Sequence, residues 1–142
     1  MKKKILILNG PNLNLLGHRE PHIYGSTPWQ TFYNQLQLEY PDLEIHHFQS
    51  NHEGILIDTL QQAQGYTGII LNAGALSHYS YALYDAIRAS TIPVVEVHIS
   101  NIYQREAFRS HSVLSAACLG LISGFGLKSY QLALDFFLKY YS

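Results

Sequence analysis

The chain has 142 residues, of which 47% are hydrophobic and 13% charged, and its formal net charge at pH 7 is −1. This length predicts a single domain. A nearly neutral chain provides no field that would attract a polyanion or an acidic membrane, so we expect no nucleic-acid partner. The single cysteine, Cys118, excludes an internal disulfide and every multi-cysteine zinc pattern, and it suits a reducing compartment. We therefore expect a cytoplasmic protein.

Two apolar stretches could be mistaken for targeting or membrane segments. The first, MKKKILILNGP, has an apolar core of only four residues, whereas a signal peptide needs about 7–15. The second, LSAACLGLISGFGL, is interrupted by Ser and Gly and falls short of the roughly 20 residues that span a bilayer. We expect the first stretch to be a strand and the protein to be soluble, without a membrane partner.

Short aliphatic runs that end at Asn, Gly or Ser alternate with stretches of helical spacing along the whole chain. The pattern predicts strands over 4–9, 43–48, 68–72, 93–99 and 119–123. It predicts helices over 27–40, 52–64, 77–90 and 127–141, with a weaker one over 101–111. This alternation favours an α/β protein with a parallel sheet covered on both faces. Five strands indicate a flavodoxin-like three-layer fold with strand order 2-1-3-4-5 and a site at the carboxyl ends of the strands.

Unusual polar residues follow the predicted strands: NGPN after the first, QSNHEG after the second, NAGALSH after the third and EVHISN at the fourth. Because the carboxyl ends of parallel strands meet at one edge of the sheet, these segments predict one functional site. Each segment also has a purely structural interpretation, since Asn and Gly are common in turns and Ser77 could cap a helix.

Glu96 and His98 stand two residues apart on the fourth predicted strand, so their side chains share one face. A carboxylate bonded to one imidazole nitrogen fixes the tautomer and leaves the other nitrogen free to deliver a proton. The alternative is an ion pair that only stabilises the strand end. Just beyond, the backbone N–H groups of Ile99 and Ser100 could bind a small carboxylate.

Two further pairs have helical spacing. Arg105 and Arg109 are four residues apart, and His78 and Asp85 are seven apart, so each pair would share one face of a predicted helix. The arginines could equally be solvated surface charges. The other histidines that we considered are His46, His47, His52 and His111. None of them forms a spaced pair with a carboxylate that would make a convincing metal site.

The segment NLNLLGHREPHIYG carries Arg19 and Tyr24 between two glycines, with little apolar pattern that would bury it. Ionising a free tyrosine near neutral pH requires roughly 4 kcal/mol. A guanidinium about 4 Å away supplies roughly that much at an effective dielectric constant near 20, before desolvation is subtracted. The segment can therefore be a lid that carries a tyrosinate base with its cation. The alternative is an ordinary surface loop whose tyrosine packs on a neighbour.

The motifs LNGPNLNLLGHREPHIYG, QSNHEG, ILNAGALSH, EVHISN and YQLAL follow one another along the chain. Together they resemble the type II 3-dehydroquinate dehydratases over essentially its whole length. The resemblance implies one catalytic domain over residues 1–142 and a flavodoxin-like fold. It also implies a homododecamer built from trimers, the absence of a cofactor, and conversion of 3-dehydroquinate to 3-dehydroshikimate through an enolate. The pathway would be shikimate (aromatic amino acid biosynthesis) or quinate metabolism.

The resemblance also implies roles for individual residues. Tyr24 would be the base that removes a proton beside the ketone, and Arg19 would hold it as tyrosinate and secure the lid. Asn12 would position a water that stabilises the enolate oxygen. His98, oriented by Glu96, would protonate the departing hydroxyl in an anti elimination.

The implied substrate contacts complete the set of site residues. The substrate carboxylate would meet Ile99 and Ser100. Its hydroxyls would meet Asn72, His78 and Arg109, and Arg105 would support the charge of the site. Asp85 matches a residue that reaches the site of a neighbouring subunit.

Three positions depart from the family pattern: Tyr84 replaces a frequent Arg, Tyr103 replaces a common His, and SAAC, ending at Cys118, replaces SPVA. None carries an implied catalytic role, so the departures bear on subunit contacts. Two other classes remain open. A phosphate-binding or receiver module would need a Ser/Thr-rich or aspartate-rich loop after the first strand, where the chain has NGPNLN. An inactive structural assembly is the other alternative, although every matched catalytic position is present.

Overall fold

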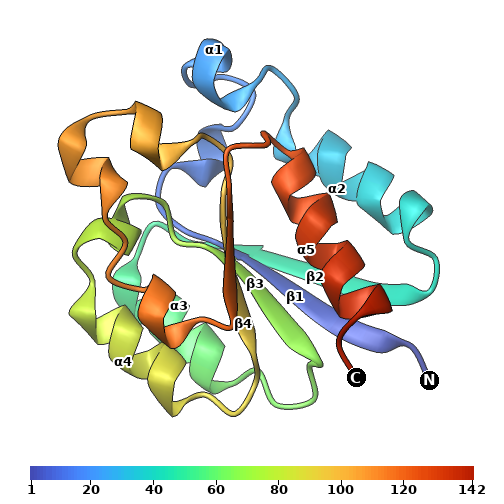
Figure 1. The fold of residues 1–142 in the computed structure, drawn as a ribbon. Helices are drawn as coiled ribbons and strands as arrows, with labels where there is room; N and C mark the ends of the chain where they lie inside the picture. The colour runs from blue at the N-terminus through green and yellow to red at the C-terminus, as the bar shows by residue number, and fades with distance from the viewer.

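The computed structural model describes residues 1–142 and contains one five-stranded parallel sheet in the order β2-β1-β3-β4-β5 (Figure 1). The strands are β1 (Lys3–Asn9), β2 (Leu43–Gln49), β3 (Gly68–Asn72), β4 (Val94–His98) and β5 (Gly120–Ser123). All five predicted strands are confirmed, and no boundary differs by more than one residue. The predicted strand order is confirmed as well.

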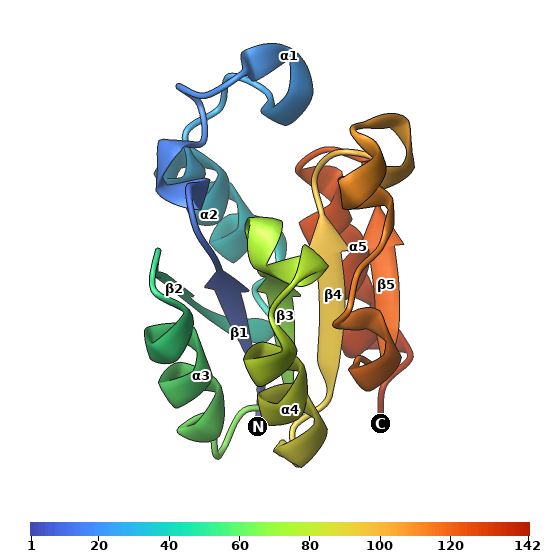
Figure 2. The same cartoon turned by 90° about the vertical axis from the view of Figure 1, so that its left-hand side faces the viewer.

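Helices cover both faces of this sheet and complete three layers (Figure 2). α2 (Trp29–Glu39) and α5 (Lys128–Lys139) pack on one face, and α3 (Glu53–Gln61) and α4 (Tyr81–Ala89) pack on the other. Alternate residues of β1 explain the two cores, because Ile5 and Ile7 face α2 and α5 whereas Leu6 and Leu8 face α3 and α4. No helix combines the length and the apolar composition needed to cross a membrane.

The third predicted helix begins later than the sequence pattern indicates. A 3₁₀ helix over Gly74–His78 precedes α4, and the Oγ of Ser80 caps α4 by accepting a hydrogen bond from the Leu83 amide at 3.0 Å. The prediction that His78 and Asp85 share one helical face is therefore wrong, because only Asp85 belongs to α4.

The weak helix predicted over 101–111 is also wrong. The segment forms two 3₁₀ helices, Ile102–Gln104 and Ala107–Ser110, with an extended Arg105 between them. The side chain of Asn101 caps the first by accepting a hydrogen bond from the Tyr103 amide at 3.1 Å. Arg105 and Arg109 consequently do not share a helical face, although this turn of chain brings both toward the same cavity.

The segment over residues 17–25, which we call the lid loop, contains the short helix α1 (Pro21–Tyr24), which no helical periodicity in the sequence predicts. The helix starts at a proline and ends at Gly25, whose φ is 85°. Gly17 has a φ of 94°, and a Cβ there would lie 2.9 Å from the Pro28 nitrogen, so this position requires glycine. The lid loop stands above the carboxyl ends of the strands (Figure 2).

Candidate active site

A cavity opens between the lid loop and the carboxyl ends of β1, β3 and β4, where the sequence predicts a site. Its polar and charged lining consists of Asn12, Arg19, Tyr24, Asn72, His78, His98, Ser100, Arg105 and Arg109, and Ile99 lines it too. The structure thus brings together every predicted site residue except Glu96 and Asp85. Three arginines and two histidines line the cavity and no carboxylate does, so its lining favours an anionic ligand.

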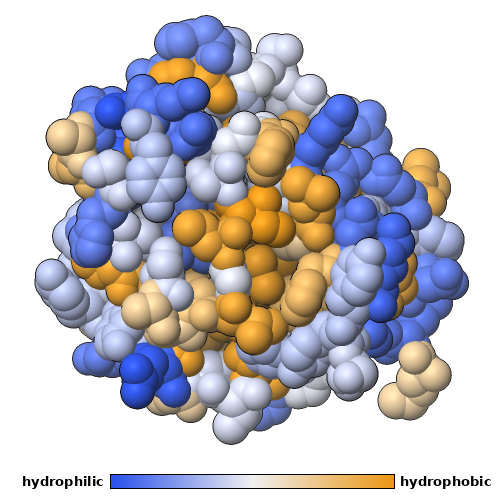
Figure 3. Space-filling model, viewed as in Figure 1, coloured by the Kyte–Doolittle hydropathy of each residue, from blue (hydrophilic) through white to orange (hydrophobic).

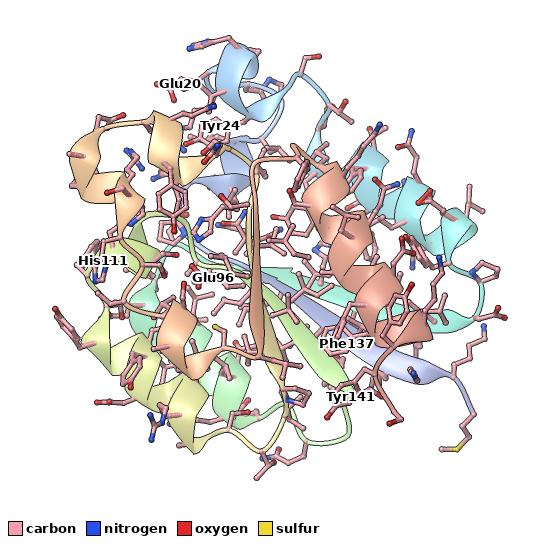
Figure 4. The ribbon with its side chains drawn as sticks, in the orientation of Figure 1. Glu20, Tyr24, Glu96, His111, Phe137 and Tyr141 are labelled. Atoms are coloured by element: carbon pink, nitrogen blue, oxygen red, sulfur yellow. The ribbon has the colours of Figure 1, made fainter.

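Tyr24 reaches this cavity from the lid loop (Figure 4). Two guanidinium groups contact it. Nη1 of Arg105 donates a hydrogen bond to the phenolic oxygen at 2.7 Å, and the same group contacts Ser100 Oγ at 3.3 Å. Arg19 instead lies over the aromatic ring, with its Cζ 4.8 Å from the ring centroid. The cation at the phenolic oxygen is therefore Arg105, whereas the family resemblance implies Arg19 as the cation that holds the tyrosinate.

Arg105 is held from several sides. Its Nη2 lies 3.9 Å from Glu20 Oε2 in the lid loop, which links the lid to the segment after β4. Its side chain is only 13% exposed, and its buried Nε has no hydrogen-bond partner. A buried guanidinium with an unused donor is suited to binding an anionic or carbonyl oxygen.

Glu96 and His98 form the pair that their spacing predicts. Nε2–H of His98 donates to Glu96 Oε2 at 2.5 Å, which fixes the tautomer and leaves Nδ1 as the free nitrogen. Glu96 is completely buried beneath the cavity, and His98 is 5% exposed and lines it. The interpretation as a mere ion pair at the strand end does not account for an imidazole that faces a cavity.

Two serines complete the surroundings of the Glu96 carboxylate. Ser112 Oγ donates to Oε2 at 2.7 Å and Ser115 Oγ donates to Oε1 at 2.6 Å. Burial by itself would raise the pKa of Glu96, but hydrogen bonds from His98, Ser115 and Ser112 outweigh burial and the pKa is lowered. Glu96 therefore stays ionised and holds a proton on the adjacent Nε2 of His98.

His78 stands beside His98, with ring centroids 6.4 Å apart and nearly parallel planes. Its Nδ1 lies 2.9 Å from the carbonyl oxygen of His111, and since a carbonyl only accepts, Nδ1 carries the hydrogen. Burial lowers the pKa of His78 and outweighs the hydrogen bond to the His111 backbone, which by itself would raise it. A neutral His78 can therefore accept a hydrogen bond at Nε2 from a ligand hydroxyl.

Two asparagines and Arg109 complete the polar lining. Asn12 adopts a left-handed backbone conformation with φ of 70°. Its backbone N–H supports this conformation by donating a hydrogen bond to Asn51 Oδ1 at 3.0 Å. Asn72 ends β3 and is 4% exposed. Nε of Arg109 donates to Glu106 Oε2 at 3.0 Å, which positions the guanidinium at the rim.

Sequence reasoning missed several contributors to the site. Ser112 and Ser115 were not assigned, although both lie close after the matched segments. The small and apolar residues of the cavity lining also had no predicted role. They are Pro11, Leu13, Gly74, Ala75 and Ile102. These residues carry no chemical signal of their own, because the fold alone decides which apolar groups border a cavity.

The remaining site residue and the departures from the family pattern lie away from the cavity. Asp85 is exposed on α4, and Tyr103 is 64% exposed. Tyr84 packs against the core beneath α4, and its hydroxyl accepts a hydrogen bond from Arg88 at 3.3 Å. Burial raises the pKa of the Cys118 thiol to about 12.

The histidines outside the cavity make other contacts. His46 bridges Glu44 Oε2 and Tyr66 Oη, each at 2.9 Å, at the edge of the sheet. His47 accepts a hydrogen bond from Trp29 Nε1 at 3.2 Å. No group of three or more His, Cys, Asp or Glu side chains is arranged to hold a metal ion.

Comparison with known proteins identifies relatives along nearly the whole chain. The family model described as "Dehydroquinase class II" matches residues 3–138. A 3-dehydroquinate dehydratase of Caldicellulosiruptor saccharolyticus is 55% identical over 93% of this chain and 94% of its own, and one of Bacillus cytotoxicus is 56% identical over 93% and 92%. The crystal structure of a type II dehydroquinase from Butyrivibrio crossotus is 45% identical, with a TM-score of 0.94 over 97% of this chain and 99% of that one. On this evidence the chain belongs to the class II dehydroquinase family.

Proposed function

We propose that the chain is a 3-dehydroquinate dehydratase, a lyase that converts 3-dehydroquinate to 3-dehydroshikimate in the shikimate (aromatic amino acid biosynthesis) or quinate pathway. Family membership supports the reaction, since relatives that share more than half of their residues with this chain carry that name. The observation that carries the proposal is one cationic cavity with Tyr24 and Arg105 on the lid side and His98 with Glu96 in its floor.

The arrangement suits an elimination that proceeds through an enolate. Tyr24, held as tyrosinate by the donor from Arg105 and by Arg19, removes the proton beside the substrate ketone. The electrons move onto the ketone oxygen, where a water positioned by Asn12 stabilises the enolate. When the enolate collapses, the carbon–oxygen bond breaks and the departing hydroxyl takes a proton from Nδ1 of His98 to leave as water.

The elimination is anti because base and acid approach from different sides. Tyr24 comes from the lid loop above the sheet (Figure 4), whereas His98 ends β4 and lines the cavity from that side. Glu96 stays ionised and accepts the hydrogen bond from Nε2–H of His98, which directs Nδ1 of His98 toward the cavity. No lysine lines the cavity, so the geometry favours an enolate over a Schiff base.

The proposed substrate contacts follow the polar lining. The carboxylate of the substrate binds the backbone after β4 at Ile99 and Ser100, with Arg105 supplying positive charge. Its hydroxyls bind Asn72, His78 and Arg109. The reaction requires no cofactor.

We further propose that the single catalytic domain over residues 1–142 works in the cytoplasm as a homododecamer built from trimers. Leu119, Leu121, Phe125 and Leu132 are all exposed on β5, α5 and their connections. Figure 3 shows apolar side chains gathered on the face that carries α5, and a patch of this kind is typical of an interface. The family resemblance gives Asp85 a role in the site of a neighbouring subunit, and its exposed position on α4, outside its own cavity, suits that role.

The direct test is to incubate the purified protein with 3-dehydroquinate and to follow the ultraviolet absorbance of the conjugated product. We expect turnover by the wild type and a loss of at least about 100-fold in kcat for Tyr24→Phe, since a general base contributes about that much or more. Unchanged circular dichroism would show that the variant still folds. No turnover by the wild type would refute the function, and kcat within about tenfold of wild type in the variant would refute the base.

A further inference from the structure

Three side chains form a buried hydrogen-bonded group behind the cavity floor. Tyr130 on α5 is completely buried, and its hydroxyl lies 2.8 Å from Asn9 Oδ1 and 2.8 Å from Asn72 Nδ2. Asn9 and Asn72 are paired in register at the ends of β1 and β3, so their side chains leave the same face of the sheet. Asn72 lines the cavity, whereas Asn9 and Tyr130 do not.

The donors and acceptors of this group have only one consistent arrangement. The backbone N–H of Gly74 can only donate, and it lies 3.2 Å from Asn72 Oδ1, which identifies that atom as the acceptor. The other end of the amide is therefore Nδ2, which donates to the Tyr130 oxygen. Tyr130 has one hydrogen, and it goes to Asn9 Oδ1.

One hydrogen on Nδ2 and one lone pair on Oδ1 of Asn72 remain after these contacts. We propose that Tyr130 is a positioning residue, which fixes the amide of Asn72 in the single orientation that presents this remaining donor and acceptor to a substrate hydroxyl. The inference rests on the substrate contact proposed above for Asn72. Without the tyrosine hydroxyl, only Gly74 would hold the amide, and the alternative orientations would compete with the productive one.

The chain provides a matched control for the loss of a buried hydroxyl. Tyr40 belongs to the same core cluster, is 7% exposed, and its hydroxyl donates to Asp135 Oδ1 on α5 at 2.8 Å. Like Tyr130, it joins α5 to the rest of the molecule through a tyrosine hydroxyl. Unlike Tyr130, its hydroxyl makes no hydrogen bond to a residue that lines the cavity.

The experiment compares Tyr130→Phe with Tyr40→Phe by steady-state kinetics with 3-dehydroquinate and by thermal unfolding. Both variants should lose some stability, because each removes a buried hydrogen bond. Only Tyr130→Phe should change the kinetics, with KM rising by about tenfold, the equivalent of one hydrogen bond, while kcat stays within about twofold. Equal kinetics in the two folded variants would overturn the inference.

A double-mutant cycle tests whether Tyr130 acts through Asn72. Asn72→Ala should raise KM, and adding Tyr130→Phe to it should raise KM no further. A full additional increase in the double variant would show that Tyr130 acts by another route and would overturn the inference. An unchanged KM in Asn72→Ala would refute the proposed substrate contact itself. If KM is raised in Asn72→Ala but unchanged in Tyr130→Phe, the substrate contact stands and only the positioning role of Tyr130 is refuted.

If Tyr130→Phe does not fold, Asn9→Ala tests the same inference, because Asn9 is the acceptor of the Tyr130 hydroxyl hydrogen. The tyrosine hydrogen, released from Asn9, would then be free to bond the Asn72 oxygen and favour the inverted amide. We expect KM to rise in Asn9→Ala although Asn9 lies outside the cavity, and an unchanged KM would contradict the proposed role of the tyrosine.

Discussion

Two guanidinium groups approach Tyr24, and they make different contacts. Arg105 donates to the phenolic oxygen, where the negative charge of a tyrosinate is concentrated, whereas Arg19 lies over the ring face. A direct hydrogen bond to the charged form stabilises that form more than a cation over the ring does. The structure therefore makes Arg105 the principal partner of the proposed base.

We predict that Arg105→Ala lowers kcat by more than Arg19→Ala does. Each variant loses a cation beside the proposed base, but only Arg105→Ala also loses the hydrogen bond to the phenolic oxygen. The measurement is kcat with 3-dehydroquinate for both variants and the wild type. A larger loss of kcat in Arg19→Ala would return the principal role to Arg19.

Glu96 takes part in the proposed catalysis and also contributes to the stability of the fold. Its pKa is lowered from the ordinary value of 4.5, so the folded state holds this proton less tightly than the unfolded state does. The carboxylate thus stabilises the fold above pH 4.5, and that contribution is lost as pH falls through the lowered pKa.

We predict that Glu96→Gln weakens the loss of stability on acidification, because the variant has no carboxylate to titrate at this position. Urea unfolding at pH 7 and at acidic pH should show a smaller decrease in the free energy of unfolding for Glu96→Gln than for the wild type. Asp42→Asn, at an exposed position, is the control and should behave like the wild type. An undiminished decrease in Glu96→Gln would contradict the role of the hydrogen bonds.

At the scale of elements, α5 lies unusually close to β3 at Gly68. A Cβ at this position would lie 2.2 Å from the ring of Phe137, which is completely buried. Gly54 in α3 has the opposite environment, since nothing lies within 4 Å of a Cβ built there. Packing therefore requires glycine at residue 68 but not at residue 54.

We predict that Gly68→Ala lowers the free energy of unfolding by about 1–3 kcal/mol, because the methyl group forces the core to shift. Gly54→Ala should raise it by up to about 1 kcal/mol, since alanine favours a helix over glycine. Chemical denaturation of both variants gives the comparison. A Gly68→Ala variant as stable as the wild type would show that α5 can move away from the sheet without cost.

The whole molecule carries an apolar patch around β5, the edge strand of the sheet, and we define this patch as Leu119, Leu121, Phe125 and Leu132 (Figure 3). Both the unpaired edge of the strand and these side chains favour contact with another copy of the chain. None of the four residues of the patch lines the cavity, so the patch can bind another copy without using the residues of the site.

We predict a solution mass near twelve times the subunit mass of 16.1 kDa, measured by light scattering, and a smaller species for Leu121→Glu. A charge at the centre of a buried interface opposes association. Leu38→Glu, at a residue that is 84% exposed on α2, is the control and should keep the mass of the wild type. A fully active monomer would contradict both the assembly and a site shared between subunits.

The sequence by itself determined the layers, the strand boundaries and the edge of the sheet where the site lies. Burial on both faces of a parallel sheet leaves continuous aliphatic runs, and these runs end at polar residues where the strands meet the cavity. The pairing of Glu96 with His98 was equally predictable, because both stand on one strand and the period of two fixes their common face.

Only the tertiary structure decided which groups from different segments meet. Arg105 is 81 residues from Tyr24 along the chain, and Tyr130 is 58 residues from Asn72, yet each pair is joined by a hydrogen bond. Local spacing wrongly predicted one helix for Arg105 and Arg109, because the extended Arg105 separates the segment into two short 3₁₀ helices. Periodicity reports which face of an element is buried, whereas contacts between loops depend on how the whole chain closes over the sheet.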